Sequence, residues 1–390
     1  MNNVQLQYAS LKSVILFMEP NVRLHLTCRL PSIRTAEKGT PLKIDNIRFE
    51  DNTIVVNDTE YQLSVYRKYH VEKPPVEVSG TVEHDLDEYG FKQPASNDLL
   101  PGDVRISTPT RRGIPSYSED DIKMALRNEL FRYEWELEKF RATQDGSFDY
   151  DDRMLNGLRQ RMLSFDYRRN QQKSPCDLCL QLTIWNNSII QNTYRMPHYE
   201  KLHIGMKQLM EMLFGKRQDV WTVNHMHLDV PILRWLVSGT LPVVRKLSIE
   251  DLKSTNMEAL KSCIHTLSFP LNGLQIDGSF GNWPFEIQNS NVSINSRILP
   301  IHFSWWVSHW LRHGRPIGTC FTFDFQHVEP SDWFDGISTF PEVMERSERF
   351  VKLSMRNSLV LVVSKKERIV VVNGVNKLYW TVEMKVVHAD

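Results

Sequence analysis

The residue types that most often perform metal or thiol chemistry occur in this chain as small, isolated groups. Cys176 and Cys179 form a single CxxC pair, and no second pair lies near them to complete the four ligands of a structural zinc site. The surrounding residues predict a strand, in which side chains three positions apart point to opposite faces. We therefore interpret both cysteines as ordinary strand residues and predict no metal site.

Two groups of histidines have spacings that merit a test for metal binding or catalysis. His309 and His313 lie four residues apart, on one helix face, but no glutamate follows the first to act as a metalloprotease base. We interpret them as a surface helix face. His225, His227 and Asp229 alternate along a predicted strand and would share one side of it. For this group an exposed strand face is the preferred interpretation, and a catalytic site is the alternative.

The sequence contains none of the common local signatures of an enzyme. There is no glycine-rich phosphate loop, nucleophile elbow or kinase motif. Catalytic triads assemble from distant positions, so this observation argues against an enzyme without excluding one. We expect no catalytic residues and no cofactor.

The composition is that of an ordinary globular protein. The 390 residues suffice for two or three domains of about 150 residues each. Lys+Arg and Asp+Glu both number 47, and such a balance argues against a dedicated nucleic-acid-binding protein. No apolar run approaches the roughly 18 residues of a membrane helix, and the five cysteines are scattered. We expect an intracellular protein, cytoplasmic or nuclear, that binds neither nucleic acids nor membranes.

The elements that would carry a binding surface begin in the first 36 residues, here called the N-terminal segment. Apolar residues recur at three- and four-residue steps from Leu11 to Met18, Pro20 interrupts them, and a second apolar run covers residues 22–26. Two short helices hinged at the proline are the simplest interpretation. A unit of this size cannot bury a core of its own, so we expect it to dock on something larger.

Residues 37–172 predict two further regions. In residues 37–116, three alternating apolar runs between residues 42 and 65, separated by Asp- and Asn-rich turns, predict an antiparallel β meander. A rim rich in Pro, Gly, Asp and Ser follows from residue 71. Its acidic run at residues 83–88 predicts a solvated turn, with an acidic partner-facing patch as the alternative. Residues 117–172 predict a charged helical hairpin, which could be an insertion between two more compact parts. Ser118 and the three acidic residues after it are typical of a helix N-terminus, and two series of apolar residues follow at helical spacing.

Residues 173–390 alternate predicted strands and helices, including helices over residues 202–214 and 232–238. An x-Leu-x-Ile core at Lys246–Ile249 recurs at Gly273–Ile276 and, more loosely, at Asn291–Ile294. The first spacing is about that of a leucine-rich repeat, in which each strand-plus-helix unit buries its neighbour. We predict an irregular leucine-rich-repeat-like α/β domain closed by C-terminal β strands, and an α+β class for the whole chain.

The N-terminal pattern resembles a divergent F-box. Cys28 and Arg29 fall near the Cys-Arg ending of that motif, but Leu6-Gln7 replaces its usual Leu-Pro opening and no tryptophan follows Arg29. The positions that match its apolar ridge and proline, and that the resemblance implies as partner-binding residues, are Leu11, Val14, Ile15, Pro20 and Leu24.

Most of the chain resembles a nematode-expanded family of F-box-like proteins that carries a domain of unknown function. Matching stretches include PLKIDNIRFEDNTIVVNDTEYQLSVYRKY from residue 41 and HGRPIGTCFTFDF from residue 313. The resemblance implies a Skp1-type adaptor bound through residues 6–30 and an unknown protein target on the C-terminal domain, as in a ubiquitin-ligase substrate adaptor. The alternative is an orphan binding scaffold whose N-terminal helices fold back onto the meander.

Overall fold

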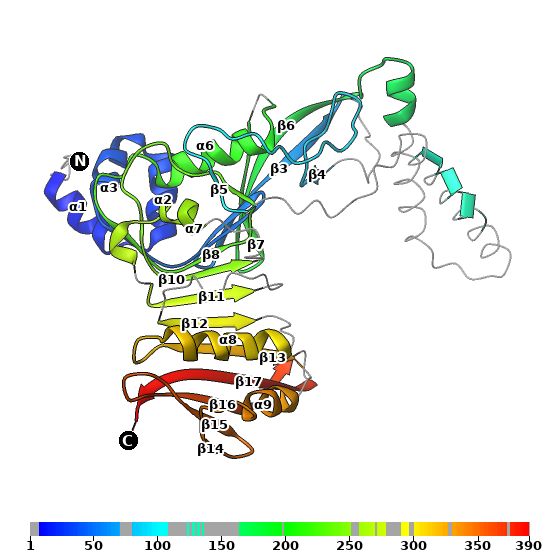
Figure 1. Cartoon of the computed structure of the whole chain (residues 1–390). Helices are drawn as coiled ribbons and strands as arrows, with labels where there is room; N and C mark the ends of the chain where they lie inside the picture. The colour runs from blue at the N-terminus through cyan, green and yellow to red at the C-terminus, as the bar shows by residue number, and fades with distance from the viewer. Residues whose placement is uncertain are drawn as a thin grey trace.

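One large mixed sheet organises the chain in the computed structural model (Figure 1). The structure describes residues 8–70, 80–107, 164–196, 199–250, 257–269, 271–277, 290–295, 300–326, 330–372 and 375–389, with short pieces between 123 and 135. The sheet follows the order β14-β15-β16-β17-β13-β12-β11-β10-β8-β1-β2-β3-β6-β7, with β4 paired to β3. Helices and a sheet of this kind confirm the predicted α+β class.

The N-terminal segment forms the two helices that its apolar spacing predicts. Helix α1 spans Tyr8–Leu16 and α2 spans Pro20–Arg29, followed by the 3₁₀ turn η1 (Pro31–Ile33) and α3 (Arg34–Lys38). The proline occupies the first turn of α2, where its missing N–H is harmless. The Glu19 carboxylate caps the same end by accepting a hydrogen bond from the Val22 amide at 3.0 Å.

The predicted meander is present and is extended by two later strands. Its strands are β1 (Leu42–Glu50), β2 (Thr53–Val56) and β3 (Thr59–Tyr69). Asn57 has a φ of 51° in the tight turn between β2 and β3, a conformation that asparagine tolerates. Antiparallel pairing then continues from β3 to β6 (Cys176–Asn186) and β7 (Ile189–Arg195).

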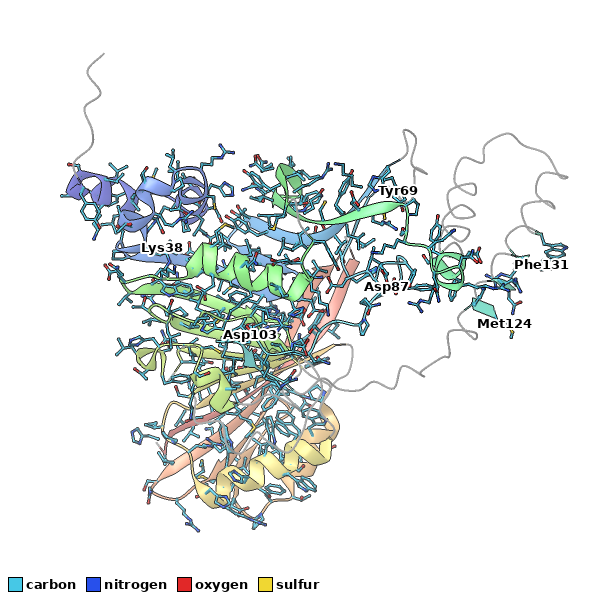
Figure 2. The ribbon with its side chains drawn as sticks, turned by 90° about the horizontal axis from the view of Figure 1, so that it is seen from above. Lys38, Tyr69, Asp87, Asp103, Met124 and Phe131 are labelled. Carbon is cyan, nitrogen blue, oxygen red and sulfur yellow. The ribbon has the colours of Figure 1, made fainter. Side chains whose placement is uncertain are left out.

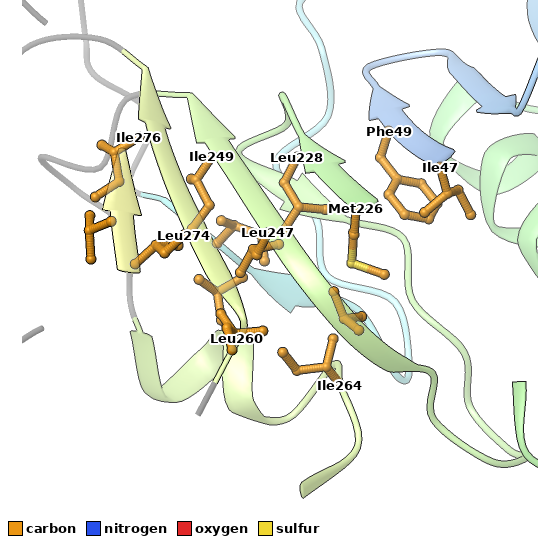
Figure 3. Packing of buried hydrophobic residues seen from close by; sticks show 14 of the residues in the cluster. Ile47, Phe49, Met226, Leu228, Leu247, Ile249, Leu260, Ile264, Leu274 and Ile276 are labelled. Carbon is orange, nitrogen blue, oxygen red and sulfur yellow. The ribbon is translucent and has the colours of Figure 1, made fainter. Parts of the chain in front are cut away.

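On the other side of β1, six strands run parallel in consecutive order: β1, β8 (Trp221–Leu228), β10 (Val243–Glu250), β11 (Gly273–Asp277), β12 (Asn291–Asn295) and β13 (Cys320–Gln326). The x-Leu-x-Ile positions are in register, since Leu247 pairs with Leu274 and Ile276 with Ile294. Figure 3 shows these apolar side chains gathered on one face of the strands, with Leu260 and Ile264 against them.

Helices and antiparallel strands complete the C-terminal half. The helical elements are α6 (Leu202–Phe214), α7 (Met257–Lys261), η3 (Thr266–Ser268), α8 (Pro300–His313) and α9 (Ser331–Ser338). The closing strands are β14 (Val343–Arg346), β15 (Phe350–Ser354), β16 (Leu359–Val372) and β17 (Val375–His388). Phe303 of α8 contacts Phe323 of β13 edge to face, so this helix packs on the apolar side of the sheet.

Two local predictions for the middle of the chain have different outcomes. Most of the predicted hairpin at 117–172 lies outside the described residues, and a helical turn covers 164–169. The helix predicted over 232–238 is wrong, because β9 (Ile232–Leu233) pairs instead with β5 (Val104–Arg105). That pairing satisfies the backbone groups of residues 232–233 with a partner far away in sequence.

The stretch 80–107, here called the strap, is tied to the body by aspartates. The predicted solvated turn is therefore wrong for Asp85 and Asp87, whereas Glu83 and Glu88 are exposed. Besides β5, it contains β4 (Thr81–Val82). Asp85 is buried, and its carboxylate accepts hydrogen bonds from the Leu202 amide at 2.9 Å and the Tyr199 hydroxyl at 2.8 Å. Asp87 pairs with Arg168 at 2.5 Å, beside the helical turn at 164–169 (Figure 2). A local acidic run thus serves as a set of long-range anchors.

Asp103 anchors the other end of the strap. Its carboxylate pairs with Lys207 Nζ at 3.2 Å and Arg234 Nη1 at 2.7 Å, and its side chain has no exposed surface. The preceding Gly102 has a φ of +84°, and a Cβ there would lie 2.7 Å from the Leu236 carbonyl oxygen. Only glycine therefore lets the strap approach the body closely enough for Asp103 to reach both cations.

We expect Asp103→Asn to lower the free energy of unfolding by about 3 kcal/mol, because it leaves two nearly buried cations without their shared counter-charge. Urea denaturation followed by circular dichroism measures the change. Asp58→Asn, which alters an exposed carboxylate in the turn between β2 and β3, is the control and should match the wild type. Equal midpoints for all three proteins would contradict the anchoring role of Asp103.

Candidate functional site

The N-terminal segment exposes an unusual number of large apolar side chains. Phe17, in the turn between α1 and α2, is 88% exposed. An isolated exposed apolar residue is common, but several on one short segment make it a candidate for partner binding. We define the apolar surface as the exposed residues Tyr8, Val14, Leu16, Phe17, Val22 and Leu30.

Of the five predicted partner-binding residues, two are buried, two are half-buried and one is exposed. Ile15 and Leu24 are 2% and 0% exposed, and Leu24 belongs to the main hydrophobic core. Leu11 and Pro20 are half-buried, and Val14 is 50% exposed. The helices therefore use one apolar side to dock on the chain and leave the other side, with Val14, in solvent.

A buried carboxylate fixes the segment to the body. Glu37 Oε1, on α3, accepts from Arg23 Nη2 on α2 at 3.2 Å and from Arg217 Nη2, after α6, at 2.7 Å. All three side chains are at most 2% exposed. Burial lowers the pKa of both guanidinium groups below the usual value, and the Glu37 carboxylate opposes that effect. Arg23 also donates to the carbonyls of Pro41 and Thr40.

Lys38, labelled in Figure 2, is the residue after Glu37 and makes a second connection to the body. Its Nζ donates to the carbonyl oxygens of Leu213 at 2.6 Å and Met212 at 3.2 Å, in the last turn of α6. A cation suits this position, since the C-terminal end of a helix carries partial negative charge. Burial and the neighbouring Arg217 nevertheless lower the pKa of Lys38 to about 7.

The inner side of α2 rests on the meander through polar contacts as well as apolar ones. Asn21 donates to the Val56 carbonyl at 3.0 Å and accepts from the Tyr61 hydroxyl at 3.1 Å. Burial raises the pKa of Tyr61, so this hydroxyl stays a donor. The His25 ring meets the Tyr61 ring edge to face at 5.8 Å. The orientation of α2, and with it the apolar surface, is thereby defined.

A second candidate surface lies on the parallel strands, opposite their apolar side. Strand register aligns Arg48 with His227, His227 with Ser248, and Ser248 with Gln275. Five ladders bring polar side chains from six strands into a single row. We define the polar row as Arg48, His227, Ser248, Gln275, Ser293 and Thr322.

The histidine group is part of this polar face. His225 Nε2 lies 2.6 Å from Ser248 Oγ, and both His225 and His227 are half-buried. Asp229 follows the strand and is exposed. The three residues thus lie along one strand and its end, as predicted, but the two histidines are half-buried and only Asp229 is exposed.

The cysteine pair and the second histidine pair, which the sequence offers as possible metal ligands, each lie within a single strand or helix. Cys176 and Cys179 are free thiols on β6. The rings of His309 and His313 stack on α8 with centroids 4.2 Å apart. In the part of the chain that the structure describes, no three His, Cys, Asp or Glu side chains are placed to hold a metal ion.

Comparison with known proteins gives one match. A family model described as a domain of unknown function (DUF3557) matches residues 201–288. This stretch begins at α6 and includes β8, β10 and β11, so it covers half of the parallel strands. No curated protein and no solved structure matches the chain. Among the helices in the described ranges, none has the length and apolar character needed to cross a membrane.

Several residues of the N-terminal site were missed by the sequence pattern. Phe17 follows Val14 by a three-residue step, and this spacing is the signal that could have added it to the partner-binding set. Arg217 had no such signal, because its partner Glu37 lies 180 positions away in sequence. Only the folded chain brings the two together.

We expect Glu37→Gln to destabilise the protein by about 3–5 kcal/mol, because two buried guanidinium groups would lose their common anion. Urea denaturation measures the loss. The exposed Glu348→Gln is the matched control and should have no effect beyond about 0.5 kcal/mol. A wild-type midpoint for Glu37→Gln would show that the cluster does not hold the segment.

Lys38 should make stability depend on alkaline pH. Because its pKa is about 7 when folded and near the usual 10.5 when unfolded, the unfolded chain binds the extra proton between these values. The free energy of unfolding should therefore rise from pH 7 to pH 10, on the order of 3 kcal/mol. Lys38→Met should remove this rise, whereas exposed Lys43→Met should keep it. Urea denaturation midpoints measured from pH 7 to pH 10 test this prediction. A wild-type midpoint that does not change with pH would refute the lowered pKa of Lys38.

Proposed function

We propose that this chain is a protein-interaction module with two binding regions. Its N-terminal segment acts as an F-box-like unit that binds a Skp1-type adaptor through the apolar surface. Its parallel-strand domain holds a protein target. Together these would make the protein a substrate adaptor of a ubiquitin ligase. The observation that carries the proposal is the exposure of Phe17, at 88%, on a segment whose helices α2 and α3 are fixed to the body.

The free energy that the exposed apolar side chains of the segment would gain on burial supports binding of a partner. Fully burying a large apolar side chain stabilises a protein by roughly 1.5–3 kcal/mol, and the apolar surface forgoes this gain at several positions. The buried Glu37 cluster and Lys38 hold α2 and α3 in place, so these side chains cannot simply fold inward. A second protein that covers Phe17 and Val14 would recover the lost stabilisation.

The parallel strands support the second half of the proposal. Consecutive strands that lie side by side in sequence order are the arrangement of repeat proteins, which use extended strand faces for binding (Figure 1). We infer a leucine-rich-repeat-like domain on this basis. The polar row contains short, partly exposed side chains at Ser293 and Thr322, which leave room for another protein to approach the sheet.

The orphan-scaffold alternative also has an observation in its favour. Ile15 and Leu24, two of the predicted adaptor-facing residues, are buried within the chain. In this alternative the segment is a cap on the meander, and the departures from the F-box pattern at Gln7 and after Arg29 mark lost adaptor binding. The target surface on the parallel strands would be unchanged, so adaptor binding separates the two functions.

We expect the double variant Val14→Asp, Phe17→Asp to reduce co-purification with a Skp1-type adaptor at least about tenfold, because aspartates would be buried in the contact. Both positions are exposed, so the fold should survive, which the melting temperature checks. The control is Val237→Asp, Leu267→Asp, with equal charge change at exposed positions elsewhere. If wild type recovers no adaptor, or the variant recovers as much, the adaptor role fails and the scaffold alternative holds.

A further inference from the structure

Strand β7 forms one edge of the large sheet and exposes large apolar side chains along it. Ile189 is 64% exposed, Ile190 53% and Tyr194 44%. Natural proteins usually protect such edges with charged side chains. The edge strand at the other end, β14, has this protection, because two of its side chains form ion pairs. In β7 the only charged residue is Arg195, the last of the strand. The edge at β7 is therefore a candidate contact surface.

A β-bulge divides the side chains of β7 between two faces. Ile184 and Trp185 are neighbours on β6 and pair with Asn192 and Ile190, so Gln191 is an extra residue on β7. Adjacent residues of a strand face opposite sides, so Asn192 shares the side of the buried Ile184, and Ile190 lies on the reverse side. The residues of β7 on the side of Ile184, here called the β7 face, are Ile189, Asn192 and Tyr194.

Helix α2 crosses the same side of the sheet and ends at β7. Near its beginning, Asn21 accepts a hydrogen bond from the hydroxyl of Tyr61, which pairs with Ile184. At its end, Arg29 Nη2 donates to Asn192 Oδ1 at 3.4 Å. The helix thus extends from β3, across β6, to the β7 face.

The apolar surface therefore continues onto the β7 face. Leu30, the first residue after α2 and a member of the apolar surface, is 49% exposed. Ile189 and Tyr194 lie on either side of Asn192, which α2 contacts. A stable protein interface uses roughly 20–30 residues from each partner, and residues 8–38 contribute fewer exposed side chains than that. An interface of this size on the N-terminal segment would thus extend onto adjoining surface, which the β7 face provides.

Two cations border this joined surface. Arg29 and Arg34 are both exposed, and their hydrogen bonds within the described residues go to the Asn192 amide oxygen and the Thr27 carbonyl. Neither makes an ion pair with a described residue. Opposite charges across an interface speed association and fix its orientation, so a partner with carboxylates at this border fits best.

We propose that one Skp1-type adaptor covers the apolar surface and the β7 face together. An apolar strip of the adaptor would lie against Leu30, Ile189 and Tyr194, and a carboxylate beside it would pair with Arg29 or Arg34. The inference rests on the proposed function, since it assigns more surface to the same partner. Because β7 is part of the sheet that contains the parallel strands, this contact would also fix the orientation of those strands relative to the adaptor.

The test measures the affinity of the purified full chain for a purified Skp1-type adaptor by biolayer interferometry. Ile189→Asp, Tyr194→Asp should weaken binding about tenfold, because two carboxylates would be buried in the contact. The matched control is Ile190→Asp, Thr193→Asp, which makes the same charge change on the reverse side of the same strand and should bind as the wild type does. Arg34→Glu should weaken binding at least about threefold. Melting temperatures check the fold of each variant, and light scattering gives its oligomeric state.

The outcomes separate this inference from the proposed function. If the wild type binds and Ile189→Asp, Tyr194→Asp binds equally well, the β7 face is not in the contact and only the inference fails. Equal losses for this variant and its control would also overturn it, because the effect would then not depend on the face. A dimeric wild type that the same variant converts to monomers would assign the β7 face to a second copy. Wild-type affinity of Arg34→Glu would overturn the partner carboxylate. A wild type that binds no adaptor would overturn the proposed function and this inference with it.

Discussion

The placement of the N-terminal segment depends on one carboxylate shared by two guanidinium groups. Glu37 lies between Arg23 of α2 and Arg217 beyond α6, and all three side chains are buried. Removing such charges from water is costly, so a buried ion pair adds little net stability and mainly penalises every arrangement that separates its members. Here the penalty falls on any movement of α2 or α3 relative to α6. The cluster therefore specifies one geometry for the segment, and the apolar surface inherits that geometry.

Helix α6 links this cluster to the rest of the molecule because both of its ends are bound by other parts of the chain. Lys38 of the N-terminal segment donates to carbonyls in its last turn, and Asp85 of the strap accepts from its first amide. A cation at the C-terminal end and a carboxylate at the N-terminal end both complement the helix dipole. The N-terminal segment and the strap thus bind opposite ends of the same helix.

Local elements were predictable from the sequence, and long-range contacts were not. The break at Pro20, the meander turns and the in-phase Leu247 and Leu274 follow from periodicity and turn chemistry within a few residues. Which of the adjacent Val14 and Ile15 faces inward could not be decided, because both fit helical steps from Leu11. The roles of Asp85 and Glu37 depend on partners more than a hundred positions away. An acidic side chain with a distant buried partner looks the same in sequence as a solvated one.

The polar row shows how the core and the opposite face of the sheet are ordered by the same strand register. Side chains alternate between the two faces of a strand, so the register that aligns Leu247 with Leu274 on one face also aligns Ser248 with Gln275 on the other. A slip of one residue on any strand would place apolar side chains in the row and polar ones in the core. Burial of the apolar residues therefore sets the alignment of the polar row across six strands. Contacts among the row residues are not needed to produce this alignment. A protein target that binds there would meet a surface whose precision comes from the packing behind it.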